Sequence, residues 1–185
     1  LIIGVLLTGL IITIFANRKP APVNKTFGRL QIISSAWFAL THGANDGQKT
    51  MGIIALILFS AGMIPELDIP LWVIFAAAAA MGLGTFFGGY KVIKTLGVKI
   101  ARLKPYQGFA AETGGGIMLA AFAILGIPAS TTHAITGTIM GSAAARRKRA
   151  VRWNVSRQIV FSWIITIPGA AGLGIGFTYL IHLFV

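Results

Sequence analysis

A dense polar block, residues 41–50, interrupts an otherwise apolar stretch of the chain. An ionisable side chain in hydrocarbon costs at least ~2.5 kcal/mol, so a cluster of this kind predicts a functional site. Asp46 has the chemistry to hold a coupling cation or a proton, and the Asn45 carbonyl can share that role. Asn45 and Gln48 also carry amide donors for an anion. Lys49 is a candidate charge partner for the substrate or for Asp46.

A second polar group follows Pro128, where Ser130, Thr131 and Thr132 precede an apolar run. An oxyanion is bound well by hydroxyls and by the free backbone N–H groups at a helix N-terminus. This triplet therefore predicts an anion site at the start of a helix. Glu112 is the second acidic residue within an apolar segment, and it is a candidate for carrying a proton or binding the coupling cation.

Composition and charge placement indicate an integral membrane protein. Hydrophobic residues make up 56% of the chain and charged residues 11%, and the formal net charge is +12. All the Lys and Arg residues except Lys49 fall in the segments 18–29, 91–104 and 146–157. This is the positive-inside distribution of a multi-pass protein, and it argues against nucleic-acid binding. The absence of cysteine excludes disulfides and thiolate chemistry.

The predicted fold class is all-α, a polytopic membrane protein with about four spans, one of them discontinuous, plus a re-entrant helical hairpin. The whole chain, 1–185, is expected to form a single membrane domain. Two glycines flank Ala44-Asn45-Asp46, and they predict a break between two half-helices within 30–63. The predicted spans are Leu1–Ala16, which is short, then 30–63, Leu71–Tyr90, and Ser156 to about Leu183. Basic loops at 17–29, 91–105 and 146–157 are expected to be cytoplasmic in the plasma or inner membrane.

The segment 106–145 is predicted to form the re-entrant hairpin. Strongly basic residues lie at both of its ends, and Pro128 interrupts it. The second arm, Thr131–Ala145, would be about 22 Å long as a helix, which is short of the ~30 Å hydrocarbon core. A hairpin with its tip at 128–133 fits these lengths better than two full spans do.

Three motifs together resemble the inorganic phosphate transporter (Pit) family. They are His42-Gly43-Ala44-Asn45-Asp46-Gly47-Gln48-Lys49, Gly108-Phe109-Ala110-Ala111-Glu112 and Pro128-Ala129-Ser130-Thr131-Thr132-His133. The first and last are jointly specific at this separation. The resemblance covers nearly the whole chain, is closer to bacterial members than to the sodium-coupled branch, and matches the C-terminal copy of an inverted repeat.

The resemblance implies half of an inverted-repeat secondary transporter, a symporter of inorganic phosphate coupled to protons or sodium. The N-terminal repeat is then a missing partner, and the chain is expected to be a C-terminal fragment. Inorganic phosphate and membrane lipid are the other expected partners, and a homo-oligomer is compatible with the sequence. No cofactor and no resident metal are expected, although the substrate could be a metal–phosphate complex. In the family, residues matching Asn45, Asp46, Glu112 and the Ser-Thr-Thr stretch handle phosphate and cations.

Other interpretations of the same residues stay open at this stage. The block 41–50 could be a loop outside the membrane, Ser130–Thr132 could only cap a helix, and Glu112 could pair with a base at the cytoplasmic interface. An intramembrane hydrolase using Ser130 and His133 is the enzyme alternative, but the sequence lacks an orienting acid and the usual hydrolase motifs. An ion channel subunit is the other alternative, because broken helices also build selectivity filters.

Overall fold

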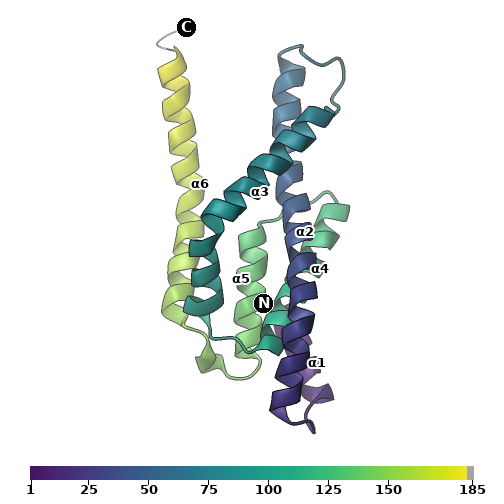
Figure 1. The fold of residues 1–185 in the computed structure, drawn as a ribbon. Coiled ribbons are helices and arrows are strands. Elements are labelled where there is room, and N and C mark those ends of the chain that lie inside the picture. Colours follow the sequence, from purple (N-terminus) through teal and green to yellow (C-terminus); the bar gives the residue numbers. More distant parts are fainter. Residues whose placement is uncertain (183–185) are drawn as a thin grey trace. The chain divides into compact units, whose positions relative to one another are not determined.

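The computed structural model describes residues 1–182, apart from the side chain of Lys91. Every regular element in this range is helical, as predicted, and Figure 1 shows their course. In chain order they are α1 (Ile2–Ile14), α2 (Pro20–Ser60), α3 (Leu71–Lys94), the π-helix η1 (Thr95–Ile100), α4 (Pro105–Ile124), α5 (Thr131–Ala144), the 3₁₀ turn η2 (Lys148–Ala150) and α6 (Trp153–His182).

The chain divides into two compact units, a division that the sequence did not suggest. The first unit, Leu1–Val151, contains α1 to η2, and the second, Arg152–Val185, contains α6. The predicted last span agrees with α6, although Leu183, its expected end, lies outside the described residues. Among the described residues, Leu71–Tyr90 and Trp153–His182 are the two helices long and apolar enough to cross a bilayer by length and composition.

The helix break predicted within 30–63 was wrong. Residues 20–60 form one continuous helix, α2, of 41 residues, and Gly43 and Gly47 lie inside it. A glycine in a helix costs about 1 kcal/mol relative to alanine, whereas each unsatisfied backbone group in hydrocarbon costs several. The helical hydrogen bonds therefore prevail over the glycines in α2.

The basic segments are also more helical than predicted. Residues 20–29 were expected to be a loop, but they form the first turns of α2, which has Lys19 as its N-cap and a proline at its start. Proline is tolerated there because the first N–H groups of a helix have no partner within it. The segment 91–105 likewise contains the end of α3 and the π-helix η1, so the predicted loops are mostly helix ends.

The predicted hairpin is present as α4 and α5, joined by residues 125–130. α4 ends at Ile124, and Gly126, two residues further on, adopts a φ of 67°. The Gly126 and Ile127 N–H groups donate to the carbonyls of Ala123 and Phe122, an arrangement that satisfies the last carbonyls of the helix. Pro128 follows, and Ser130 then caps α5. The turn therefore begins three residues earlier than predicted, and Thr131 already belongs to α5.

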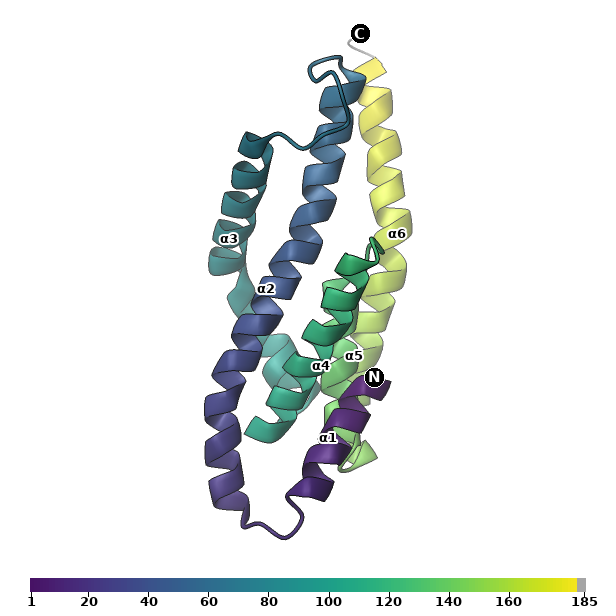
Figure 2. The ribbon, with the colours of Figure 1, turned by 90° about the vertical axis from the view of Figure 1, so that its right-hand side faces the viewer.

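Within the first unit, α4 packs between α2 and α5 (Figure 2). α2 and α4 run parallel, because Phe27 contacts Phe109 while Phe38, further along α2, lies against Gly115. α4 and α5 run antiparallel, and a buried hydrogen bond of 3.0 Å from Gln107 Nε2 to the Ser142 carbonyl joins them. This order places the tip of the hairpin beside the middle of α2.

Small residues allow α1 to approach α5 closely. A side chain at Gly4 would meet the backbone of Thr138 and Ser142, and one at Gly141 would meet the backbone of α1. The hydroxyls of Thr8 and Ser142 share a buried hydrogen bond of 2.6 Å across the same contact. Small residues serve membrane helices in this way, because packing rather than the hydrophobic effect holds such helices together.

Candidate substrate and cation site

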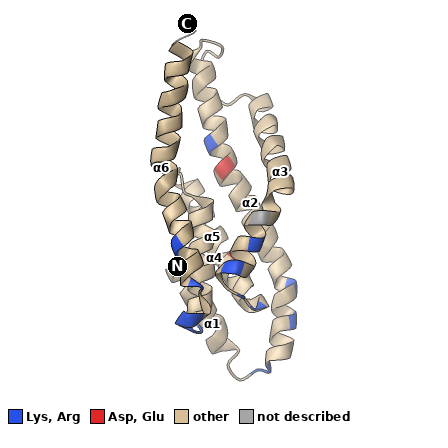
Figure 3. Cartoon of the chain, turned by 90° about the vertical axis from the view of Figure 1, so that its left-hand side faces the viewer, with Lys and Arg blue, Asp and Glu red and all other residues tan. Residues whose placement is uncertain are grey.

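Asp46 is the centre of a polar cluster between α2 and the start of α5. Its Oδ1 accepts a hydrogen bond from Lys49 Nζ at 2.8 Å, and its Oδ2 accepts one from the Thr131 hydroxyl at 2.9 Å. The Nε2 atom of His42 lies 3.2 Å from Oδ2, one helical turn before Asp46. Figure 3 shows acidic and basic positions next to each other partway along α2. Asp46 and Thr131, which are 85 residues apart in the sequence, thus meet in the folded chain.

The carbonyl oxygen of Ala129, at the tip of the hairpin, is the second acceptor in this cluster. Asn45 Nδ2 donates to it at 2.9 Å, and the Lys49 ammonium also donates to it. Asn45 is almost fully buried, with 3% of its surface exposed. Because α4 ends before this carbonyl and α5 begins after it, the oxygen has no partner in a helix, and α2 supplies both of its donors. We call Asp46, His42, Asn45, Lys49, Thr131 and the Ala129 carbonyl the Asp46 cluster.

The oxygen atoms of the Asp46 cluster are those that hard cations prefer. Carboxylate, carbonyl and hydroxyl oxygens bind sodium-like and calcium-like ions, whereas soft metals need sulfur or several imidazoles. The Lys49 ammonium bridges the Asp46 carboxylate and the Ala129 carbonyl, so a positive charge already occupies the space between them. No group of three or more His, Asp and Glu residues that could hold a metal ion occurs within residues 1–182.

The remaining predicted substrate ligands differ in their contacts. Ser130 accepts a hydrogen bond from the His133 N–H at 3.3 Å, so its hydroxyl caps α5, as one of the open interpretations had it. Thr132 and Gln48 are exposed, and within residues 1–182 their side chains make no hydrogen bond. The first N–H groups of α5 also lack partners within the helix. Donors for an anion are therefore available beside the Asp46 cluster.

Glu112 does not join the Asp46 cluster in this structure. It lies on α4, where its carboxylate accepts hydrogen bonds from the Ser34 hydroxyl at 2.6 Å and from Gln31 Nε2 at 3.3 Å. Ser34 precedes Asp46 by about 18 Å along the axis of α2. The alternative that Glu112 pairs with a basic loop residue finds no support among the described residues, since its hydrogen-bond partners are neutral.

Gln31, Ser34 and the Ala129 carbonyl were missed by the sequence analysis. Gln31 and Ser34 are polar residues three positions apart on a helix with apolar neighbours, so helical spacing could have indicated a shared partner. The Ala129 carbonyl carries no signal in the sequence. It becomes available only because the backbone leaves one helix and enters another at that residue.

The fold and the cluster define a class: a helical membrane protein with a charged, hydrogen-bonded site inside its apolar helices, as solute carriers have. The chain belongs to the Phosphate transporter family, whose sequence profile matches residues 4–174. This family consists of transporters rather than enzymes, and membership also makes the chain a membrane protein. The resemblance stated from the motifs is thereby confirmed.

Named relatives agree with this assignment. A probable low-affinity inorganic phosphate transporter of Rhizobium meliloti (strain 1021) is 50% identical over 92% of this chain and 51% of its own length. A protein of the same description from Bacillus subtilis (strain 168) is 41% identical over 94% of this chain and 52% of its own length. A solved structure described as the sodium-dependent phosphate transporter is 32% identical, with a TM-score of 0.71, over 85% of this chain and 41% of that one. The chain thus spans about half the length of the curated relatives it matches.

Proposed function

We propose that this chain forms one repeat of a secondary active transporter that moves inorganic phosphate across the cell membrane together with a coupling cation. The observation that carries the proposal is the Asp46 cluster, which joins a carboxylate and its counter-charge in α2 to the N-terminus of α5. The names of the relatives support phosphate as the substrate.

Cation and phosphate would occupy adjacent parts of this site. Asp46, with the Ala129 carbonyl and the Asn45 amide oxygen, is proposed to take up the coupling cation, either a proton on the carboxylate or a sodium ion among the oxygens. Phosphate is proposed to bind the first N–H groups of α5 together with the side chains of Thr132 and Gln48. Thr131, which contacts Asp46 and is the first residue of α5, would link the two parts.

Lys49 offers a way to couple the two ligands. Its ammonium lies between the Asp46 carboxylate and the Ala129 carbonyl, where a coupling cation would compete with it. A proton or sodium ion arriving at Asp46 would release the ammonium, which could then pair with the phosphate anion. Cation binding would thereby create a charge partner for the substrate, and this differential affinity is what coupling between two sites requires.

Glu112 is proposed as a second proton or cation carrier, held by Gln31 and Ser34, which precede Asp46 on α2. The inverted second repeat would supply a symmetry-related set of ligands around the same pathway. Assembly of complete transporters into a homo-oligomer is compatible with this arrangement.

The hairpin α4–α5 is proposed to be re-entrant, with both of its basic ends on the cytoplasmic side. Lys104, before α4, and Arg146, after α5, line the same pocket and therefore lie at the same end of the first unit. The chain contains no cysteine. Single cysteines placed at Lys104 and Arg149 of the complete protein should both react only with a membrane-impermeant maleimide added from the cytoplasmic side. Two full spans would also place both ends in the cytoplasm, so a third cysteine at Ala129, at the tip of the hairpin, separates the two topologies: rapid labelling of that position from outside would indicate two full spans.

Uptake into proteoliposomes tests the function directly. The complete transporter, reconstituted with labelled phosphate outside, should accumulate phosphate above its external concentration when a proton or a sodium gradient is imposed separately. One of the two gradients should drive accumulation and the other should not, which identifies the coupling ion. Equilibration without accumulation under both gradients would favour a channel, and no phosphate flux at all would contradict the proposed substrate.

A further inference from the structure

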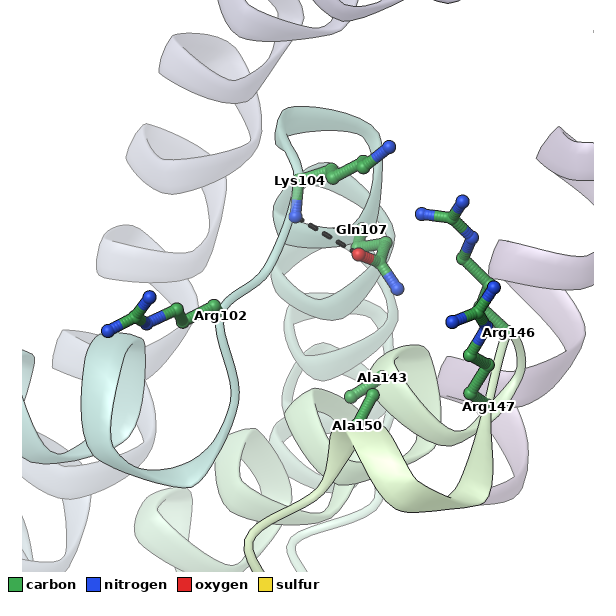
Figure 4. Close-up of a pocket in the computed structure, with 7 residues that line it drawn as sticks. All are labelled: Arg102, Lys104, Gln107, Ala143, Arg146, Arg147 and Ala150. Carbon is green, nitrogen blue, oxygen red and sulfur yellow. Dashed lines mark hydrogen bonds between the residues drawn. The ribbon is translucent and has the colours of Figure 1, made fainter.

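A second polar site lies at the basic end of the first unit, away from the Asp46 cluster. A pocket of about 160 Å³ is lined by four basic residues, Arg102, Lys104, Arg146 and Arg147, together with Gln107 and two alanines. In Figure 4, Arg102 lies on one side of Gln107, and Arg146 and Arg147 lie on the other. Two connections, one between η1 and α4 and the other between α5 and η2, converge here.

These basic side chains carry no compensating acid. None of the four forms an ion pair within residues 1–182, where the two ion pairs both involve Asp46. Like charges around one small pocket repel one another. The positive N-terminus of α4, which begins directly after Lys104, adds to the potential. An anion would relieve this repulsion.

An apolar pocket adjoins the basic one. It measures about 320 Å³ and shares Lys104 and Arg146 with its neighbour, and Arg18 adds a third base. The rest of its wall is mainly apolar, with Ile11, Ile12, Phe15, Ala16, Pro20, Val23 and Tyr106. Asn24 also lines it, and its Oδ1 atom is buried without a hydrogen-bond partner among the described residues. Positive charge and an apolar surface therefore meet at Lys104 and Arg146.

We infer that the two pockets together bind an anionic phospholipid, with the headgroup phosphate held by Lys104 and Arg146 and an acyl chain along the apolar wall formed by α1 and the start of α2. Basic pockets between membrane helices bind anionic headgroups through the charges of their Lys and Arg side chains. The apolar wall favours a lipid over free phosphate, because free phosphate has no apolar part that could bind there.

The positive-inside rule alone does not explain this arrangement. That rule requires basic residues near the ends of membrane spans, and it is indifferent to whether their side chains surround a common pocket. Lys25 and Arg29 illustrate the difference, because they are exposed basic residues near the start of α2 that line neither pocket. The inference is independent of phosphate transport, since it concerns residues outside the Asp46 cluster.

Lipid binding to the purified complete protein tests the inference. The titrant is a mixed micelle that contains fluorescently labelled phosphatidylglycerol, or phosphatidylcholine as the zwitterionic reference. The wild type should bind phosphatidylglycerol at least about tenfold more tightly, and Lys104→Gln/Arg146→Gln should weaken that binding about 10- to 30-fold. The matched variant Lys25→Gln/Arg29→Gln, which removes the same charge outside the pockets, should retain the preference. Lys104→Arg/Arg146→Lys should also retain it.

Several results would overturn the assignment. Equal affinity of the wild type for the two lipids, or an undiminished preference in Lys104→Gln/Arg146→Gln, would show that the pocket does not select an anionic lipid. Equal losses in the pocket variant and the matched variant would mean that only diffuse charge attracts lipid. Displacement of phosphatidylglycerol by millimolar inorganic phosphate would assign the pocket to the free anion. Arg18→Gln, in the apolar pocket, is an independent variant and should weaken phosphatidylglycerol binding as well.

Discussion

Asp46→Asn should abolish gradient-driven phosphate uptake by the complete transporter, with a loss of at least about 100-fold. The amide cannot take up a proton or balance a cation, and it leaves the Lys49 ammonium without its carboxylate in a partly buried site. A 100-fold loss corresponds to about 2.8 kcal/mol of cation-binding free energy, since every 1.4 kcal/mol is tenfold in an equilibrium constant. Uptake of labelled phosphate under the driving gradient is the measurement.

The matched control for this change is Glu66→Gln. Glu66 is an exposed acid in the connection between α2 and α3, far along the chain from the hairpin. The Glu66→Gln variant should insert into the membrane and transport phosphate like the wild type. Detection of normal amounts of Asp46→Asn protein in the membrane separates a defect in transport from a defect in folding. Wild-type uptake by Asp46→Asn would exclude Asp46 as the coupling site.

Lys49→Gln should produce the second large effect, a loss of at least about tenfold in uptake, because the Asp46 carboxylate and the Ala129 carbonyl lose their common cationic partner. Lys49→Arg keeps the charge and should be milder. If the ammonium competes with a sodium ion for this position, Lys49→Gln should also lower the sodium concentration at which the remaining uptake is half-maximal. Uptake is measured over a range of sodium concentrations at fixed pH.

Gln48→Ala distinguishes this role from general damage to the block 41–50. Gln48 is adjacent to Lys49 in sequence but is exposed, and its side chain makes no hydrogen bond in the described part of the chain. It should raise the KM for phosphate without changing the sodium dependence. A Lys49→Gln protein with normal uptake, or one whose phosphate KM alone changed, would show that Lys49 does not compete with the cation.

The continuous helix α2 shows which structural features a local sequence pattern can predict and which it cannot. The two glycines around Ala44-Asn45-Asp46 correctly drew attention to this segment, but they did not break the helix. Glycine permits a break without requiring one, and the decision depends on whether another element satisfies the released backbone groups. The spacing of residues in a local pattern carries no information about whether such a neighbouring element is present. The helix ends at Gly62 and Gly126, by contrast, do use glycine conformations that other residues avoid.

By itself, the sequence determined the all-helical membrane character, the family and the identity of the polar residues within the apolar segments. These follow from composition, from the placement of Lys and Arg, and from motifs that are local in the chain. Only the tertiary structure decided which of those residues meet. Asp46 contacts Thr131 because α4 runs parallel to α2 and ends beside the middle of α2, where α5 then begins. Glu112 lies earlier on α4 and is held by Gln31 and Ser34, about three turns before Asp46 on α2. The Ala129 carbonyl and the shared pocket of Lys104 and Arg146 arise from helix ends brought together by packing. Every residue has a backbone carbonyl oxygen, so the sequence does not show which of them is free to bind a side chain or an ion. That depends on where the helices end.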